Sequence, residues 1–91
     1  MASSRKPNDE AISASDMKSL GRRIRQLRGF DVTQDEFASK LGISQSQLSK
    51  YERGVLAPPA GVLIRIKDKC RVSIDWLLTG DPQRGGHEPR C

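Results

Sequence analysis

The polar side chains between positions 45 and 53 carry groups that can contact a nucleic acid. The amide of Gln45 can pair with the edge of adenine, and the ammonium of Lys50 can donate to the acceptor atoms of guanine. Three more polar side chains lie in the same stretch: Ser46, Ser49 and Arg53. Counted at about 100° per residue, they lie opposite the apolar pair Leu48 and Tyr51, with Gln45 at the start of the helix. A solvated helix surface would be equally polar, so the surrounding elements decide between these interpretations.

Positive charge is concentrated in the middle of the 91-residue chain, whose formal net charge is +5. Residues 17–72 hold 12 Lys and Arg against 5 Asp and Glu, a balance of +7, whereas residues 1–16 and 73–91 are each −1. A compact basic segment is typical of a protein that binds a polyanion, and nucleic acid is the commonest polyanion in the cytosol. The alternative is a solvated basic surface without a partner.

Other chemistries find little support in the residue types. Asp35 and Glu36 form a carboxylate pair, but Glu36 serves a helix cap, and no constellation of His, Ser or Lys accompanies them. His87 lies in a Gly- and Pro-rich tail that does not organise it for catalysis or for a metal. With two cysteines we expect no disulfide framework: Cys70 is interpreted as a small core residue, and Cys91 has no assigned role. We therefore expect no enzyme activity, no metal and no cofactor.

The composition also bears on location. Apolar residues make up 35% of the chain and aromatic residues 4%. The chain has no apolar run of about 18 residues, and residues 1–15 lack the apolar centre of a secretory signal. We therefore expect a cytoplasmic protein without a membrane segment. A chain of this size has room for one small domain.

The apolar residues recur at helical spacing, and no alternating strand pattern is longer than a few residues. We expect a first helix that has Asp16 as its N-cap and runs to about Arg28. Four more helices are predicted after Thr33, after Ser44, from Pro59 and after Ser73, the last ending at Gly80. The pattern thus predicts an all-α domain over residues 16–80, with flexible tails at residues 1–15 and 81–91.

The second and third predicted helices form a helix-turn-helix. Thr33 and Glu36 make a T-x-x-E capping box, and the same signature recurs from Ser44 as S-x-x-Q. Between the helices, Gly42 lies where a tight turn needs a positive φ. Two capped helices with so short a connection are typical of a unit that docks in a DNA groove. The polar face of residues 45–53 is therefore a candidate DNA-reading surface.

Three segments carry a resemblance to a known family: LGRRIRQLRG, VTQDEFASKLGISQSQLSKYERG and VSIDWLLTG. Over about residues 18–80 the chain resembles helix-turn-helix proteins of the Cro and phage-repressor type, the XRE family. The resemblance implies a compact five-helix, lambda-repressor-like domain whose third helix lies in the DNA major groove. It also implies a transcriptional regulator, in particular a repressor, that binds a palindromic double-stranded DNA operator as a homodimer.

The resemblance assigns roles within the motif. The positions that match base-reading residues are Gln45, Ser46 and Lys50. The positions that match backbone-contacting or flanking residues are Gln34, Ser44, Ser49 and Arg53. Gln34 in particular matches a residue that contacts phosphate and braces the recognition helix. This agrees with the attraction of a helix N-terminus for a phosphate oxygen.

Two further expectations concern the rest of the fold. Arg28 and Glu52 lie at the edges of the apolar faces of their helices, and the family pairs the equivalent groups. We therefore predict a partly buried ion pair, with two unrelated surface charges as the alternative. Trp76 points roughly away from Ile74 and Leu77 on the fifth helix. It is either an anchor for a second copy in a dimer or a cover for the edge of the core.

A second functional hypothesis belongs to another class of protein. The same domain with flexible tails also fits an antitoxin-type interaction module, which would bind a toxin and its own operator. Nothing in the composition of the tails requires such a partner. A neighbouring toxin-like reading frame would favour this hypothesis.

Overall fold

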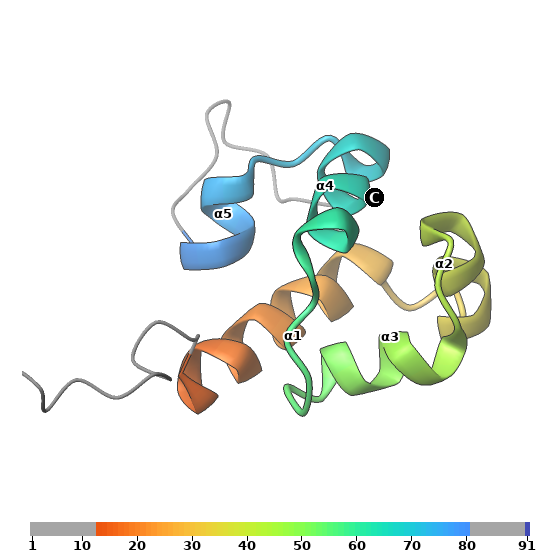
Figure 1. Ribbon diagram of the computed structural model, residues 1–91. Coiled ribbons are helices and arrows are strands. Elements are labelled where there is room, and N and C mark those ends of the chain that lie inside the picture. Colours follow the sequence, from red (N-terminus) through yellow and green to blue (C-terminus); the bar gives the residue numbers. More distant parts are fainter. Residues whose placement is uncertain (1–12, 81–90) are drawn as a thin grey trace, which may run out of the picture.

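The structure, a computed structural model, describes residues 13–80 and residue 91. This part of the chain consists of five α-helices and contains no strand (Figure 1). The helices are α1 (Ala14–Arg28), α2 (Gln34–Leu41), α3 (Gln45–Glu52), α4 (Ala60–Cys70) and α5 (Ile74–Thr79). None of these described helices is long and apolar enough to cross a membrane. The predicted all-α fold of five short helices is confirmed.

Helix α1 begins earlier than the sequence predicted. The N-cap is Ser13, whose hydroxyl accepts the backbone N–H of Asp16 at 3.1 Å. Asp16 itself lies in the first turn, where a carboxylate is favoured by the positive end of the helix dipole. Ser and Asp are both good N-cap residues, so residue type alone does not separate them. Ala14 and Ser15 are therefore helical and not part of the predicted tail, while residues 1–12 lie outside the described residues.

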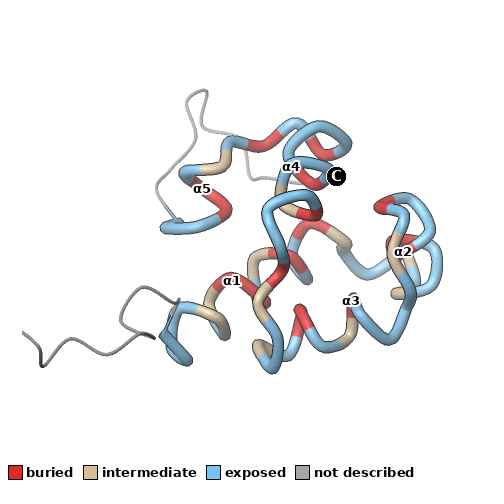
Figure 2. The backbone as a smooth tube through the Cα atoms, in the orientation of Figure 1, coloured by how far each residue is buried: buried red, intermediate tan, exposed pale blue. Residues whose placement is uncertain are grey.

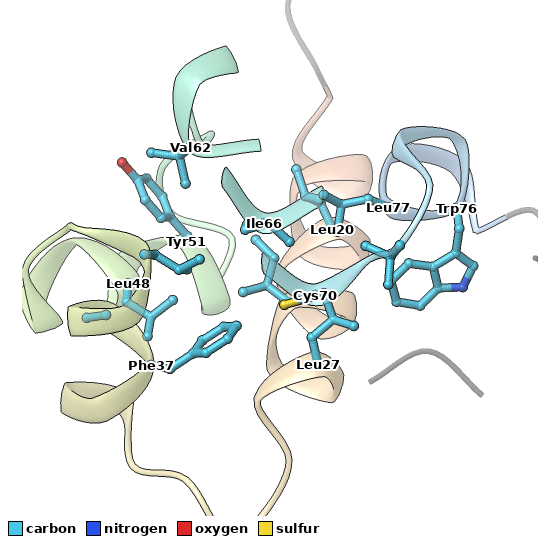
Figure 3. Close-up of a cluster of buried hydrophobic side chains, with 14 residues drawn as sticks. Leu20, Leu27, Phe37, Leu48, Tyr51, Val62, Ile66, Cys70, Trp76 and Leu77 are labelled. Carbon is cyan, nitrogen blue, oxygen red and sulfur yellow. The ribbon is translucent and has the colours of Figure 1, made fainter. Parts of the chain in front are cut away.

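One apolar core joins all five helices (Figure 3). Its largest fully buried side chains are Leu20, Ile24, Phe37, Leu41, Leu48, Ile66 and Leu77. Helix α1 packs against α3 and α5, and α4 packs against α2 and α5. Figure 2 shows buried positions alternating with exposed ones along the helices. Burial of one such side chain stabilises a fold by about 1.5–3 kcal/mol. Packing therefore holds these helices, since helices this short are unstable alone.

Helix α1 can lie directly on α3 because Gly21 has no side chain. A Cβ atom added at Gly21 would lie 2.5 Å from the carbonyl oxygens of both Tyr51 and Glu52. The last turn of α3 thus rests on the backbone of α1. This contact sets the separation of the two helices.

Two arginines hold the ends of helices that are distant in sequence. Arg23 of α1 donates to the carbonyl oxygen of Leu77 at 2.8 Å through Nε and to that of Leu78 at 3.0 Å through Nη2. Arg65 of α4 donates through Nη1 to the carbonyl oxygen of Leu41 at 3.1 Å. A cation at a helix C-terminus satisfies carbonyl groups that have no partner inside the helix. These bonds tie α5 to α1 and α2 to α4.

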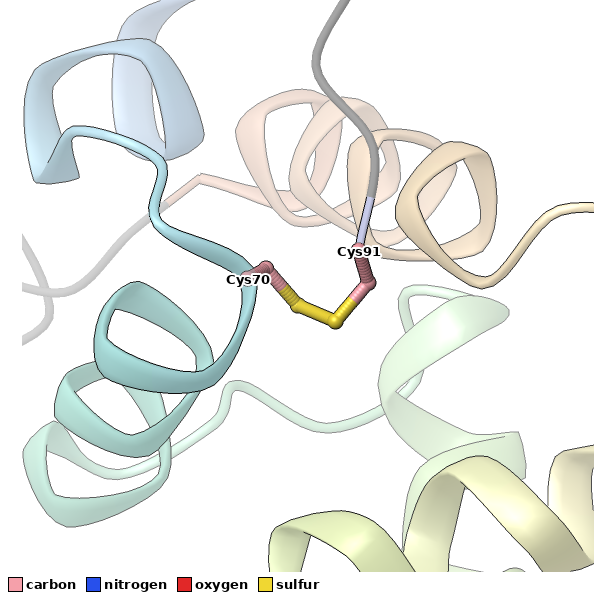
Figure 4. The surroundings of a disulfide bond; sticks show 2 residues. All are labelled: Cys70 and Cys91. Atoms are coloured by element: carbon pink, nitrogen blue, oxygen red, sulfur yellow. A yellow bond between two sulfur atoms is a disulfide. The ribbon is translucent and has the colours of Figure 1, made fainter.

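A disulfide joins Cys70, the last residue of α4, to Cys91 (Figure 4). The expectation that the two cysteines form no disulfide, with no role for Cys91, is therefore wrong. Cys70 is a core residue as predicted, with 5% of it exposed. Cys91 also donates its backbone N–H to the carbonyl oxygen of Leu27 at 3.2 Å. Two cysteines 21 positions apart give no sign in the sequence that they meet. Residues 81–90 of the predicted tail lie outside the described residues.

Trp76 belongs to the core of the domain. It is 7% exposed and lies at one edge of the apolar cluster, with the indole nitrogen directed away from it (Figure 3). Of the two alternatives that the sequence leaves open, the structure has the cover for the core edge and not an exposed anchor. The reason is that the six-residue helix α5 packs against both α1 and α4, which buries more than one of its sides.

Candidate nucleic-acid interface

Both helices of the helix-turn-helix begin with the capping boxes predicted from the sequence. In α2 the Thr33 hydroxyl accepts the N–H of Glu36 at 3.1 Å, and the Glu36 carboxylate accepts the N–H of Thr33 at 2.9 Å. At the start of α3, Ser44 and Gln47 exchange the same two bonds, each at 3.0 Å. Each box satisfies donors that the first turn of a helix leaves without a partner. The start of each helix is therefore fixed by residues close to it in sequence.

Gly42 allows the tight turn between α2 and α3. Its φ of 75° and ψ of 28° lie in the left-handed region, as predicted. Its N–H donates to the carbonyl oxygen of Ser39 at 3.1 Å, and the N–H of Ile43 donates to that of Ala38 at 3.0 Å. This pair of bonds is a Schellman motif, which closes the end of a helix. The chain can therefore leave α2 at Leu41 and start α3 at Gln45.

The outward side of α3 carries the polar side chains singled out from the sequence. Gln45, Ser46, Lys50 and Arg53 are exposed, and Ser49 is half-buried. On the inward side, Leu48 is 0% and Tyr51 is 3% exposed. Nε of Arg53 donates to the Ser49 hydroxyl at 3.3 Å. Within the described residues, neither Lys50 nor Arg53 forms an ion pair, so both charges are available to an anion.

Gln45 is held in place by the side chain of Gln34. Nε2 of Gln45 donates to Oε1 of Gln34 at 2.6 Å, and Nε2 of Gln34 donates to Oε1 of Glu52 at 3.0 Å. The first residue of α3 is thus tied to the first residue of α2, which in turn is tied to the last residue of α3. The bond orients the Gln45 amide. One Nε2 hydrogen and free capacity on Oε1 remain for an outside partner.

The predicted ion pair between Arg28 and Glu52 supports this arrangement. Nε and Nη2 of Arg28 donate to the two carboxylate oxygens of Glu52 at 2.8 and 3.0 Å, a bidentate geometry. The two side chains are 15% and 4% exposed, so the pair is largely removed from water. The hydrogen bond to Glu52 raises the pKa of Arg28 above its ordinary value; burial acts against this rise, and the negative charge of Glu52 adds to it. The pair locks the end of α1 to the end of α3.

Sequence reasoning missed one contact of this network. Nη1 of Arg28 donates to the backbone carbonyl oxygen of Val32 at 3.0 Å, which closes the connection between α1 and α2. A backbone acceptor has no side-chain signature, so residue types could not indicate it. In the part of the chain that the structure describes, no group of three or more His, Cys, Asp or Glu could hold a metal ion. The surface offers a partner hydrogen-bonding groups and positive charge.

Known proteins share this helix-turn-helix. A sequence model of a family described as Helix-turn-helix matches residues 22–77. The HTH-type transcriptional regulator ImmR of Bacillus subtilis (strain 168) is 39% identical over 64 residues, which are 69% of this chain and 50% of that protein. The cryptic phage CTXphi transcriptional repressor RstR of Vibrio cholerae serotype O1 is 36% identical over 61 residues, which are 67% of this chain and 54% of that protein. The chain thus spans about half the length of these relatives.

A longer match and a solved structure agree with these relatives. An uncharacterized transcriptional regulator in the ATPase CF(0) region of Rhodospirillum rubrum is 36% identical over 76 residues, which are 78% of this chain and 70% of that protein. The crystal structure of the P22 c2 repressor protein in complex with synthetic operator 9T in the presence of Tl+ superposes with a TM-score of 0.63 and 30% identity. It covers 68% of this chain and 96% of the repressor chain. The capped helices, the Gly42 turn and these matches show that the chain belongs to the helix-turn-helix family of the Cro and phage-repressor type.

Proposed function

We propose that the chain is a transcriptional regulator that binds double-stranded DNA sequence-specifically and acts as a repressor. The observation that carries this proposal is the outward side of α3. There Gln45 is oriented by its bond to Gln34, and Lys50 projects a charge without an ion-pair partner among the described residues. A helix of this kind fits the major groove, where amide and ammonium groups can discriminate bases.

The proposed base-reading residues are Gln45, Ser46 and Lys50. With one Nε2 hydrogen donated to Gln34, the Gln45 amide still has an adjacent donor and acceptor, which is the pair that adenine N7 and N6 require. Lys50 has three donors for guanine O6 and N7. The Ser46 hydroxyl can serve either kind of base.

Four further residues are proposed to contact or flank the DNA backbone: Gln34, Ser44, Ser49 and Arg53. Gln34 and Ser44 lie at the starts of α2 and α3. Backbone N–H groups at a helix start, together with the helix dipole, favour a phosphate oxygen. Arg53 adds a charge at the other end of α3, beside Ser49. Contacts at both ends of the helix would hold it along the groove.

The relatives favour regulation over the antitoxin hypothesis. ImmR is named a transcriptional regulator, RstR is named a transcriptional repressor, and the P22 c2 repressor structure contains a synthetic operator. A protein bound over a promoter would act by occlusion. This role needs no cofactor and no catalytic group, and a regulator of this kind is expected to act in the cytoplasm.

We also propose that the chain acts as a homodimer on a palindromic operator. One recognition helix reads only a few base pairs, and paired copies read half-sites about 34 Å apart, one turn of DNA. Trp76 is 7% exposed within the domain, so little of its side chain is available to a second copy. Light scattering after size exclusion, with and without a palindromic duplex, measures the stoichiometry.

Selection of binding sites from a random duplex pool tests the proposed function. We expect an enriched palindromic sequence, bound with an affinity that falls steeply as salt rises, because phosphate contacts release counterions. Scrambled duplexes of the same length serve as the control. The proposal is wrong if the purified protein shows no salt-sensitive binding to any duplex.

A further inference from the structure

We propose that the Cys70–Cys91 disulfide is a redox-modification site that a dithiol reductant opens. Opening it would loosen the connection between α1 and α2, which is linked by hydrogen bonds to the proposed DNA-reading residue Gln45. We call this connection, residues 29–33, the α1–α2 turn. The expected effect on DNA affinity rests on the proposed function. The expected effect on the α1–α2 turn rests only on the contacts of Cys91.

Cys91 lies beside the end of α1, where the α1–α2 turn begins. Its backbone N–H donates to the carbonyl oxygen of Leu27, in the last turn of α1, at 3.2 Å. It lines an open hollow of about 1090 Å³ together with Gly29 and Phe30. It also lines a second hollow of about 330 Å³ with Phe37 of α2. Cys91 therefore lies beside the end of α1, as Figure 4 shows, and shares both hollows with residues of the α1–α2 turn.

The disulfide connects this contact to a rigid part of the fold. Cys70 ends α4 and is 5% exposed within the core. Helix α4 packs against α2, and its Arg65 donates to the carbonyl oxygen of Leu41 at the end of α2. While the disulfide is closed, Cys91 is held covalently to the core. Once it is opened, the Leu27 bond and local packing are the described contacts that hold Cys91 in place.

A continuous set of contacts leads from the α1–α2 turn to the proposed reading residue. Arg28 follows Leu27 in sequence, and its Nη1 closes the turn on the carbonyl oxygen of Val32. The same guanidinium holds Glu52, Glu52 accepts from Gln34, and Gln34 accepts from Gln45. Each member has its position set by the next. A looser end of α1 would therefore broaden the orientation of the Gln45 amide.

The chemistry is thiol–disulfide exchange. A thiolate of the dithiol attacks Sγ of Cys91, because Cys91 is exposed and Cys70 is buried. A mixed disulfide with Cys91 forms, and Cys70 leaves as a thiolate that takes up a proton. The second thiol of the reductant then attacks the reductant sulfur that is bonded to Cys91. This step closes a disulfide within the reductant and releases the Cys91 thiolate, which is also protonated. The protein disulfide gains two electrons and two protons, and the dithiol becomes a disulfide. Disulfides inside cells are usually transient and redox-sensing, which fits a DNA-binding regulator.

The test compares the full chain with the disulfide closed, the full chain reduced by dithiothreitol, and Cys91→Ser. Mass and thiol labelling establish the redox state. We expect reduction to speed amide exchange in residues 29–33 more than at Leu48, the reference in the core. We also expect the Kd for the selected duplex to rise about fivefold, within the usual range for coupled sites. Cys91→Ser should match the reduced chain and ignore the reductant.

Several results would overturn this inference. One is a chain that shows equal exchange and equal Kd in both redox states, and another is Cys91→Ser that behaves as the oxidised chain does. If no duplex is bound in either state, the proposed function fails. The exchange data then decide the inference alone: a larger increase in exchange on reduction in residues 29–33 than at Leu48 supports the link to the turn, and an equal or absent increase overturns it.

Discussion

Helices α2 and α3 differ from α4 in how their ends are held. The two helices of the helix-turn-helix each begin with a complete capping box, and α2 ends at a left-handed glycine, Gly42. Helix α4 has Pro59 as its N-cap, without a side-chain cap bond, and Arg71 as its C-cap, which adopts the left-handed region with φ 57° although it is not glycine. Its last residue is held by the disulfide to Cys91.

This difference distinguishes α2 and α3, which carry the proposed DNA-contacting residues, from α4, which packs against α2. The caps of α2 and α3 come from residues within a few positions, so these starts are encoded locally. The position of α4 depends on partners elsewhere in the chain, namely Cys91 and the carbonyl group that Arg65 holds. Because α2 and α3 are fixed by nearby residues and α4 by distant ones, we expect mutations in these regions to have different effects.

The largest effect is expected at the ion pair that joins the end of α3 to the end of α1. Glu52→Ala removes the partner of Arg28 and leaves a mostly buried charge without compensation. We expect the free energy of unfolding to fall by about 3–5 kcal/mol, measured by urea denaturation. Asp68→Ala is the control, because the Lys67–Asp68 pair is exposed and should contribute less than about 1 kcal/mol. Equal losses for the two variants would mean that the Arg28 pair has no structural role.

The glycine under α3 gives the next largest effect. Gly21→Ala places a Cβ atom 2.5 Å from two backbone carbonyl oxygens, so α1 and α3 must separate. We expect the free energy of unfolding, measured by thermal denaturation, to fall by about 1–3 kcal/mol. Gly61→Ala in α4 is the matched control, because nothing lies within 4 Å of the new methyl group. This second variant should gain up to about 1 kcal/mol in helix propensity. A neutral Gly21→Ala would show that the two helices adjust freely.

Lys50→Ala tests whether reading is separable from stability. Lys50 is exposed on α3, so the Tm should not change. Binding should lose about 1–3 kcal/mol at one base-pair position of the selected site and relax specificity there. Arg53→Ala is the comparison, since loss of a phosphate contact should weaken all sequences and reduce the salt dependence. If Lys50→Ala weakened binding to all sequences equally, Lys50 would be a contact to the DNA backbone and not to a base.

The smallest effect is expected at the end of α4. Arg71→Gly removes the steric penalty of a left-handed non-glycine residue, about 1–2 kcal/mol, and adds part of it back as chain entropy. We expect the free energy of unfolding, measured by thermal denaturation, to rise by about 0.5–1 kcal/mol. Lys69→Gly, inside the same helix, should instead lose about that amount. Destabilisation by Arg71→Gly would show that the Arg71 side chain holds the end of α4.

What could be predicted from the sequence follows the same division. The capping boxes at Thr33 and Ser44 and the turn at Gly42 depend on near neighbours, and their residue types predict them. The outward side of α3 follows from helical periodicity. The pairing of Cys70 with Cys91 joins residues distant in sequence, so no local pattern predicts it.

The remaining differences have local causes. Ser13 and Asp16 are both suitable caps, and only the hydrogen bond between them shows which one starts α1. The burial of Trp76 depends on neighbours from other helices, which a single helix does not show. For the candidate site, the resemblance supplied the brace by Gln34 and the Arg28–Glu52 pair, while the contact to the Val32 carbonyl had no sequence signal.

The backbone contact at Gly21 has a consequence for engineering. Because the last turn of α3 rests on main-chain atoms of α1, this contact does not involve the side chains on the outward side of α3. If the outward residues were exchanged for those of another regulator, the contact at Gly21 would remain, but the bond between Gln45 and Gln34 would have to be replaced. Gly21 is therefore the position of α1 to keep unchanged when the DNA-contacting residues of α3 are redesigned.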